Sequence, residues 1–279
     1  PDGIQVTLVE SPDVNTIGVG EGTWPSMRNT LQTIGISETE FVRECSAAFK
    51  QGSKFVGWKN GRADDFYYHP FTVPNSYTQS NLPAAWQSHF SNMSFADAMC
   101  EQSHICEAGL APKQFTTPEY AGVANSGYHL DAGKFGQLLQ KHCTAKLGVK
   151  HVLDHVTHIN STADGDIESI ATKNSGAITG DLFIDCSGLS CLLLGQHFQI
   201  PFLDKKEFSI NDTALAIQTP YPEDNSPIAS PTIATAQASG WIWDIGLSSR
   251  RGTGHVYSSA HISDEKAEQT LRAYLAKAV

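Results

Sequence analysis

Several chemical features are scarce in this sequence of 279 residues, and each shortage excludes a class of protein. There is no run of lysine and arginine, and 19 basic against 29 acidic side chains give a formal net charge of −10. That balance argues against a nucleic-acid partner. No apolar stretch approaches the length of a membrane span, so we expect no membrane insertion. With 40% hydrophobic and 17% charged residues, the chain has the composition of one large globular domain or two lobes.

Cysteine is present, but without the spacing of a redox or metal motif. None of the six cysteines forms a C-x-x-C pair. Several of them lie in apolar patterns, where a cysteine usually serves as a small core residue. We therefore expect reduced thiols in a cytoplasmic protein.

Familiar catalytic motifs are also missing. The sequence has no G-x-S-x-G elbow and no Walker pattern. On a helix, His151, His155 and His158 could share a metal ion. The surrounding alternation of apolar and polar residues predicts a strand instead, on which His158 points away from the other two. We expect no metal site.

The stretch GVGEGTWPS, residues 18–26, is the most unusual feature that is present. Its glycines, Gly18, Gly20 and Gly22, do not have the G-x-G-x-x-G spacing of a pyrophosphate loop, and no helix follows directly after the third. We call residues 18–23 the glycine strap. Glycine permits close backbone approach, so we expect the strap to lie flat against a planar group.

The remaining pattern predicts an α/β fold. Residues 4–10 read as a strand ending at Glu10, where a dinucleotide-binding fold places an acid against a ribose hydroxyl. A three-stranded meander is expected over 149–186, its third strand being Asp181–Cys186, beside a cofactor. The other expected elements are helices at 27–34, 38–50, 94–106, 131–147 and 264–279, a strand at 54–58, and an aromatic loop at 60–92.

Three groups of residues could carry chemistry. Lys50, predicted near a helix end beside Phe49, would have a lowered pKa in apolar surroundings. The aromatic segment around His69, and Trp241 with Trp243 on one face of a strand, could sandwich a planar substrate. Taken alone, Lys50 is better explained as a surface lysine, and the aromatic residues are at least as well explained by core packing.

The combination of these segments resembles one family, the flavin-dependent halogenases, and within it the tryptophan halogenases. The strap resembles their GVGEAT-P segment, and SAAFKQGSKFVGW places Lys50 where they carry a catalytic lysine. FYYHPF, YHLDAGKF, DLFIDCSG, GWIWDIGL and GTGHVYSS resemble further family segments in the same order. The likeness extends from about residue 4 to residue 260.

The resemblance implies a fold and a reaction. The fold would be an FAD-binding Rossmann-like module (residues 1–48 and 93–199) with a substrate region (49–92 and 200–279). Reduced FAD from a separate flavin reductase, oxygen and chloride or bromide would yield hypohalous acid. A lysine would deliver the halogen to an electron-rich aromatic such as tryptophan or another indole. The resemblance leaves a homodimer open.

By the same resemblance, the site residues can be named. Lys50 would be catalytic. His69, Phe71, Trp241 and Trp243 would bind substrate. Cofactor contacts would come from Glu10, Gly18, Val19, Gly20, Glu21, Gly22, Thr23, Asp185 and Gly188.

Three departures from the family pattern modify this expectation. No G-x-G-x-x-G precedes Ile4, and the glutamate that partners the lysine is expected beyond the GWxW segment. We therefore expect an incomplete chain that is inactive on its own. Gly246 replaces a family proline, which affects only local backbone geometry. A flavin-dependent aromatic hydroxylase and a non-catalytic protein that binds an aromatic ligand are the alternatives.

Overall fold

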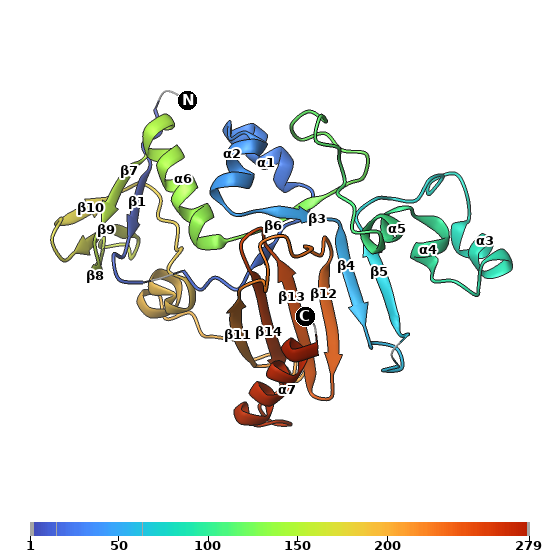
Figure 1. Ribbon diagram of the computed structural model, residues 1–279. Helices are drawn as coiled ribbons and strands as arrows, with labels where there is room; N and C mark the ends of the chain where they lie inside the picture. The colour runs from blue at the N-terminus through green and yellow to red at the C-terminus, as the bar shows by residue number, and fades with distance from the viewer. Residues whose placement is uncertain (1–2, 15, 63, 278–279) are drawn as a thin grey trace. The chain divides into compact units, whose positions relative to one another are not determined.

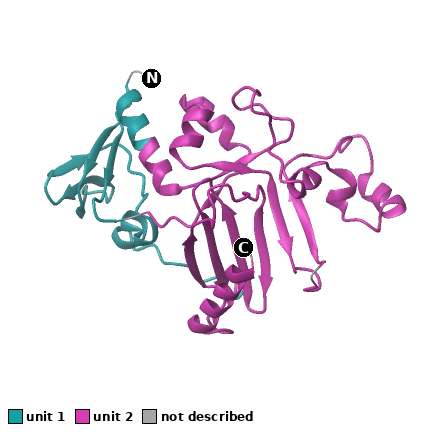
Figure 2. Ribbon diagram, viewed as in Figure 1, with its two compact units in different colours: residues 1–15, 139–208 teal, residues 16–138, 209–279 magenta. Residues whose placement is uncertain are grey.

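The protein is described by a computed structural model that covers residues 3–14, 16–62 and 64–277. The chain divides into two compact units (Figure 2). Unit 1 consists of residues 1–15 and 139–208, and unit 2 of residues 16–138 and 209–279. The division into an FAD-binding module and a substrate region follows other boundaries, and it stays a prediction about function.

Unit 1 is built from two small sheets. The strand β1 (Thr7–Glu10) pairs in parallel with β7 (Lys150–Leu153), so Glu10 stands at the carboxyl end of its strand. An antiparallel meander contains β8 (Val156–Ser161), β9 (Ile167–Thr172) and β10 (Ala177–Thr179). The short helices η1 (Gly188–Ser190) and η2 (Leu192–His197) follow.

The meander is confirmed, but its predicted third strand is wrong. That place is taken by β10, while residues 181–186 form no strand, and Leu182 and Ile184 are exposed. The cause is local. The Asp185 carboxylate accepts hydrogen bonds from the backbone N–H groups of Ser187, Leu193 and Leu194, at 3.1, 2.9 and 3.2 Å. An acidic side chain bonded in this way holds the backbone in a turn rather than in a ladder.

Unit 2 contains two sheets with helices around them (Figure 1). The small sheet has the order β2-β6-β3, and the large one the order β11-β14-β13-β12-β4-β5. The strands are β2 (Glu21–Gly22), β3 (Ala48–Lys50), β4 (Gly52–Val56), β5 (Phe66–Pro70), β6 (Gly127–Leu130), β11 (Thr213–Thr219), β12 (Thr232–Gln237), β13 (Gly240–Gly246) and β14 (Arg251–Tyr257). The helices are α1 (Met27–Ile34), α2 (Glu38–Glu44), α3 (Leu82–His89), α4 (Phe95–Met99), α5 (Gln102–Glu107) and α7 (Asp264–Lys277), and α6 (Ala132–Lys146) spans the boundary of the units. Parallel and antiparallel pairs occur together, which confirms the mixed α/β class.

Lys50 lies in a strand, so its predicted position near a helix end is wrong. The helix α2 begins where the sequence predicts, with the Ser37 hydroxyl accepting a hydrogen bond from Glu40 N at 3.1 Å. It ends at Glu44, because Ser46 adopts a left-handed backbone with φ of 48°. Beyond that residue the chain extends as β3 and pairs with β6, Lys50 opposite Gly127.

Two further segments depart from the prediction. The aromatic stretch 60–92 is not a loop throughout, since it contains β5 and α3, and β5 completes the edge of the large sheet. The single helix expected over 94–106 is divided into α4 and α5, because Cys100 is extended, with φ of −141° and ψ of 132°. The predicted cap at Ser94 is confirmed by its hydrogen bond from Asp97 N.

The large sheet presents two different faces. On one, Trp241, Trp243 and Ile245 alternate along β13. On the other, α7 packs against β14, and the buried Asp244 pairs with Arg251 and accepts a hydrogen bond from Tyr274. The helix α7 thus packs on the face opposite the two tryptophans.

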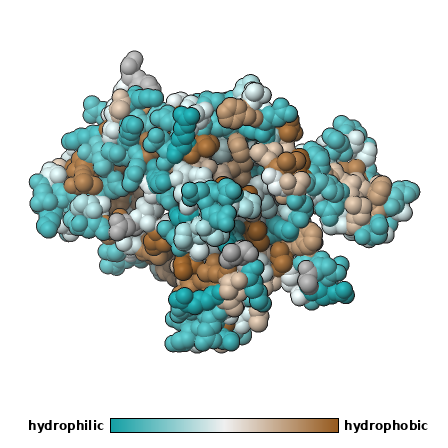
Figure 3. Space-filling model, in the orientation of Figure 1, coloured by the Kyte–Doolittle hydropathy of each residue, from teal (hydrophilic) through white to brown (hydrophobic). Residues whose placement is uncertain are grey.

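The surface seen in Figure 3 is mostly hydrophilic, with separate apolar patches. None of the helices in the described part of the chain is long and apolar enough to cross a membrane. Exposed apolar side chains include Phe202 and Phe208 near the end of unit 1.

The packing of Trp243 predicts that Gly254 tolerates no larger side chain. A Cβ atom at Gly254 would lie 2.1 Å from Cη2 of Trp243 and 2.6 Å from the carbonyl oxygen of Leu215. In the whole natural protein we expect Gly254→Ala to lower the free energy of unfolding by about 1–3 kcal/mol, measured by urea denaturation. Gly136→Ala is the matched control. Gly136 is exposed in α6 with nothing within 4 Å of its Cβ position, so alanine there should be neutral or stabilising. Equal stability of the two variants would contradict the packing argument.

Candidate active site

Lys50 lies beside two aromatic rings at one end of the glycine strap. Its Nζ is 5.5 Å from the ring centre of Phe71 and 5.9 Å from that of Trp24, and the two rings are 5.4 Å apart. A Cβ atom at Gly22 would lie 2.9 Å from Nζ, and His129 also faces this position. We call Gly22, Trp24, Lys50, Phe71 and His129 the lysine region; all five belong to unit 2.

The surroundings of Lys50 destabilise its protonated form. Burial lowers the pKa of Lys50 from its ordinary value of 10.5. Among the described residues, none forms a hydrogen bond or ion pair with its Nζ. Burial, reinforced by the nearby Lys50 charge, lowers the pKa of His129 to about 3, so its imidazole is neutral. His129 Nε2 lies 2.9 Å from the Thr232 hydroxyl. Neither the neutral imidazole of His129 nor the hydroxyl of Thr232 carries a negative charge that could stabilise protonated Lys50.

The glycine strap connects the lysine region to the tryptophan face of the large sheet. Val19 packs against the cluster that contains Trp243 and Ile245. A Cβ atom at Gly252 would lie 1.9 Å from the carbonyl oxygen of Val19, so the strap and β14 are in direct backbone contact. After Gly20, residues Glu21 and Gly22 pair with β6, and Gly22 lies beside Lys50. The strap therefore contacts both groups of residues that the sequence singles out.

Trp241 and Trp243 lie side by side, as predicted. Their ring centres are 6.4 Å apart and their planes meet at 61°. Trp243 is buried, and within the described residues its Nε1 has no hydrogen-bond partner. Trp241 also faces Trp58, at 6.4 Å between ring centres. The pair lies at the Val19 end of the strap, and no ring contact joins it to Lys50 in the described part of the chain.

The predicted substrate wall is brought together only in part. Phe71 belongs to the lysine region. His69 is exposed on β5 and has no hydrogen bond or ring contact to Lys50. Sequence reasoning missed two members of the region, Trp24 and His129. Trp24 belongs to the stretch GVGEGTWPS, residues 18–26, and its position just after the glycine strap is the signal that could have identified it. His129 lies within YHLDAGKF but shows no separate signal.

Two side chains of the strap are engaged within the protein. The carboxylate of Glu21 accepts hydrogen bonds from Val19 N at 3.3 Å and from Ala132 N at 3.1 Å, which joins the strap to the start of α6. The hydroxyl of Thr23 accepts a hydrogen bond from Tyr128 N at 3.0 Å. A ligand at the strap would therefore meet backbone groups and glycine hydrogens rather than these polar side chains.

The cofactor residues predicted in unit 1 are Glu10, Asp185 and Gly188. One oxygen of the Glu10 carboxylate lies 3.0 Å from His151 Nε2, and its other oxygen has no partner among the described residues. That free acceptor, at the carboxyl end of a parallel strand, fits a ribose hydroxyl. Burial alone would raise the pKa of Asp185, but hydrogen bonds from Ser187, Leu193 and Leu194 lower it. Gly188 is left-handed, with φ of 63°.

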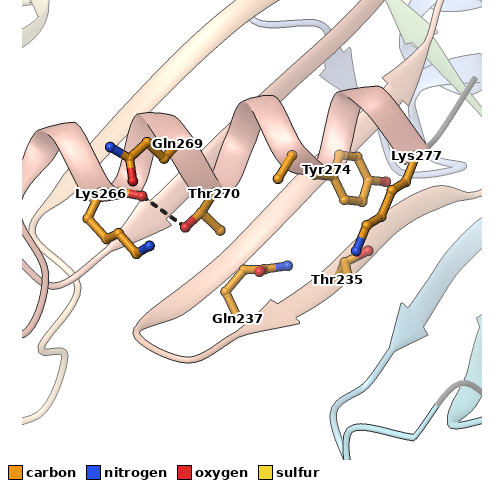
Figure 4. A pocket seen from close by; sticks show the side chains of 8 residues that line it. Thr235, Gln237, Lys266, Gln269, Thr270, Tyr274 and Lys277 are labelled. Carbon is orange, nitrogen blue, oxygen red and sulfur yellow. Dashed lines mark hydrogen bonds between the residues drawn. The ribbon is translucent and has the colours of Figure 1, made fainter.

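A groove between α7 and β12 encloses about 560 Å³ (Figure 4). Its lining holds Lys266, Lys277, Gln237 and Tyr274 among others, and the Thr270 hydroxyl donates to the carbonyl of Lys266 at 2.9 Å. None of the predicted site residues lines it. Thr235 and Gln237 also point to the face of β12 opposite the tryptophans, so this groove is separate from the lysine region.

No metal site emerges from the described residues. No group of three or more histidine, cysteine or acidic side chains there is arranged to hold an ion. Two of the three histidines considered above are engaged separately, His151 with Glu10 and His155 with Asp13, at 3.0 and 2.7 Å. The expectation of a continuous strand through them is wrong, since the chain leaves β7 before His155.

Comparisons with known proteins show the family to which the chain belongs. Residues 1–279 match the family described as tryptophan halogenase. The chain is 34% identical to tryptophan 7-halogenase RebH of Lentzea aerocolonigenes, over 94% of this chain and 52% of that one. It is 33% identical to tryptophan 6-halogenase SttH of Streptomyces toxytricini, over 98% and 55%. The crystal structure of a tryptophan halogenase from Shewanella frigidimarina superposes with a TM-score of 0.94, at 54% identity over 98% of this chain and 52% of that one.

These matches define the class of the fold as that of the flavin-dependent halogenases. The chain belongs to the tryptophan halogenase family. It spans about half the length of the relatives it matches. The family resemblance read from the sequence is thereby confirmed.

The burial of Lys50 predicts an early loss of its proton. In the chain of residues 1–279, with lysines labelled by reductive ¹³C-methylation, we expect the Lys50 signal to titrate with a midpoint below 10.5. Because the midpoint is lowered, a larger fraction of this amine is neutral at any pH below 10.5 than for an ordinary lysine. Loss of the signal in Lys50→Arg assigns it. A midpoint at or above 10.5 would show that the amine is solvated or paired.

Proposed function

We propose that the whole protein halogenates an electron-rich aromatic ring, tryptophan or another indole, with Lys50 as the catalytic residue. One observation carries this proposal. A half-buried amine without a counter-ion among the described residues lies beside Trp24 and Phe71, directly next to the glycine strap. The relatives named above act on tryptophan, at its 6- or 7-position, according to their names.

The chemistry of this arrangement follows from the amine. An amine can hold hypohalous acid by a hydrogen bond, or it can attack the halogen as the oxygen–halogen bond breaks, which gives a haloamine and releases water. Phe71 and Trp24 offer flat apolar surfaces on which an aromatic substrate can stack, and a fixed stacking geometry decides which ring carbon faces Lys50. His69, Trp241 and Trp243 would complete the substrate side, the last two by separating substrate from cofactor.

The group that would activate oxygen, which is the oxidant, is FAD. When bound in its reduced form, it would provide the hypohalous acid from oxygen and chloride or bromide. Glu10 would hold its ribose through the carboxylate oxygen that is free within the described residues. The strap, from Gly18 to Thr23, would lie along its ring, and Asp185 and Gly188 would contribute further contacts. Residues 1–48 and 93–199 would form this module, and residues 49–92 and 200–279 the substrate region.

A separate flavin reductase would deliver the reduced flavin by diffusion, in the cytoplasm. An aromatic hydroxylase is not favoured, because the family match is to halogenases and hydroxylation leaves Lys50 without a role. A protein that only binds an aromatic ligand would likewise leave the lowered pKa of Lys50 unused.

The test of this proposal is Lys50→Ala in the whole natural protein. We expect bromination of a panel of tryptophan, tryptamine and indole to fall by about 10²-fold or more, because the group that presents the halogen is removed. Oxidation of reduced FAD should continue, since Lys50 lies outside the residues assigned to the cofactor. Mass spectrometry of products and absorbance of flavin separate the two activities. Undiminished bromination would reject Lys50 as the catalytic residue.

A second substitution displaces the amine without removing it. Gly22 does not have positive φ, and an added Cβ would meet the flexible end of Lys50. We therefore expect Gly22→Ala to keep its melting temperature while the displaced amine loses activity, by about 10²-fold for a displacement near 1 Å. Gly136→Ala serves as the glycine-to-alanine control. Wild-type bromination in Gly22→Ala would show that the position of Nζ beside the strap is unimportant.

A further inference from the structure

Behind Phe71 lies a pair of fully buried glutamines that neither the sequence motifs nor the proposed chemistry explains. Gln51 and Gln102 both have 0% exposure. Gln51 follows Lys50 directly in the chain, and Gln102 is the first residue of α5. Burying a primary amide is costly unless its donors and acceptors are paired, so their contacts indicate what the pair holds in place.

The Gln102 amide holds the backbone of Phe71. Its Oε1 accepts hydrogen bonds from Phe71 N and Thr72 N, both at 2.7 Å. Its Nε2 donates to the Asn125 carbonyl at 2.6 Å and to Gln51 Oε1 at 3.4 Å. Every hydrogen-bonding position of this side chain is thereby used, and a saturated buried amide has one preferred orientation.

The same network extends to Lys50 on one side and toward Trp24 on the other. Gln51 donates from Nε2 to the Leu110 carbonyl at 2.7 Å, and its backbone N–H donates to the carbonyl of Ser230 at 3.0 Å. Asn125 donates from Nδ2 to the Phe71 carbonyl at 3.1 Å, and Arg28 of α1, four residues after Trp24, donates to Asn125 Oδ1. Phe71 is thus bonded at both its N–H and its carbonyl.

We infer that the Gln51–Gln102 pair sets the regiochemistry of the reaction, with Gln102 as a positioning residue that fixes the Phe71 ring relative to Lys50. This inference rests on the proposed function. Because a ring carbon is selected by the angle at which substrate stacks beside the amine, a small shift of Phe71 changes which carbon is closest to Nζ. Within the described residues, the side chains of the pair donate no hydrogen bond to the amine and accept none from it, so the pair acts on selectivity rather than on halogen transfer.

The experiment compares Gln102→Met with Gln102→Glu in the whole natural protein. Methionine removes both the hydrogen-bond acceptor and the donors of the amide. Glutamate keeps an acceptor for the N–H groups of Phe71 and Thr72. On whichever of tryptophan, tryptamine and indole is brominated, we expect Gln102→Met to change the ratio of bromo-isomers by about tenfold, which equals about 1.4 kcal/mol between competing transition states. Gln102→Glu should stay closer to the wild-type ratio.

Two controls keep the inference falsifiable. Leu271→Ala, buried on α7, should lower the melting temperature without changing the isomer ratio, so that instability alone is recognised. Should Gln102→Met fail to fold, Asn125→Ala releases the Phe71 carbonyl at a less buried position and should shift the ratio in its place.

Three outcomes are decisive. A shifted ratio in Gln102→Met or Asn125→Ala, with Leu271→Ala unchanged, supports the inference. An unchanged ratio in those two variants overturns it, and if Phe71→Leu does shift the ratio, the overturned step is the link from Gln102 to Phe71 alone. Failure of the proposed function is seen elsewhere, as bromination that persists in Lys50→Ala.

Discussion

The arrangement of the candidate site depends on one close approach, that of the glycine strap to β14. The carbonyl of Val19 occupies the space where a side chain at Gly252 would begin, 1.9 Å from the Cβ position. This contact fixes the strap against the tryptophan face of the large sheet, and the pairing of Gly22 with His129 fixes its other end beside Lys50. The six residues of the glycine strap thus contact both the tryptophan face of the large sheet and the lysine region beside the small sheet.

Given that position, the environment of Lys50 follows. The amine is surrounded by two rings, a glycine and a neutral imidazole, which together supply no charge to stabilise its protonated form. Burial therefore dominates and lowers its pKa. A carboxylate at hydrogen-bonding distance would reverse this effect. The sequence resemblance implies such a glutamate beyond the GWxW segment. In the whole protein, that carboxylate would oppose the effect of burial on the pKa of Lys50.

Periodicity and capping rules predicted the elements whose stability is local, such as the start of α2 at Ser37, the left-handed Gly35 after α1, and the shared face of Trp241 and Trp243. They failed where a single residue interrupts the pattern. Ser46 ends a helix that the apolar spacing continues, and Asp185 turns a segment whose composition is that of a strand. Gln102 could not be predicted at all, because its role arises from residues 30 and more positions away. The resemblance supplied Lys50; only the structure supplied Trp24 and His129.

The three glycines of the strap are now distinguishable by their physical need for glycine. Gly20 has a positive φ of 86° and lies 3.3 Å, by its Cβ position, from the Cα of Gly252, so both conformation and space require it. Gly22 has neither constraint from the backbone, and the end of the Lys50 side chain occupies its side-chain space, with Nζ at 2.9 Å and Cδ at 3.2 Å, beside His129 at 3.4 Å. Gly18 meets nothing closer than 3.8 Å. Folding therefore explains the middle glycine, whereas the last one is explained by the placement of a reactive group. That difference separates the structural part of the motif from its chemical part.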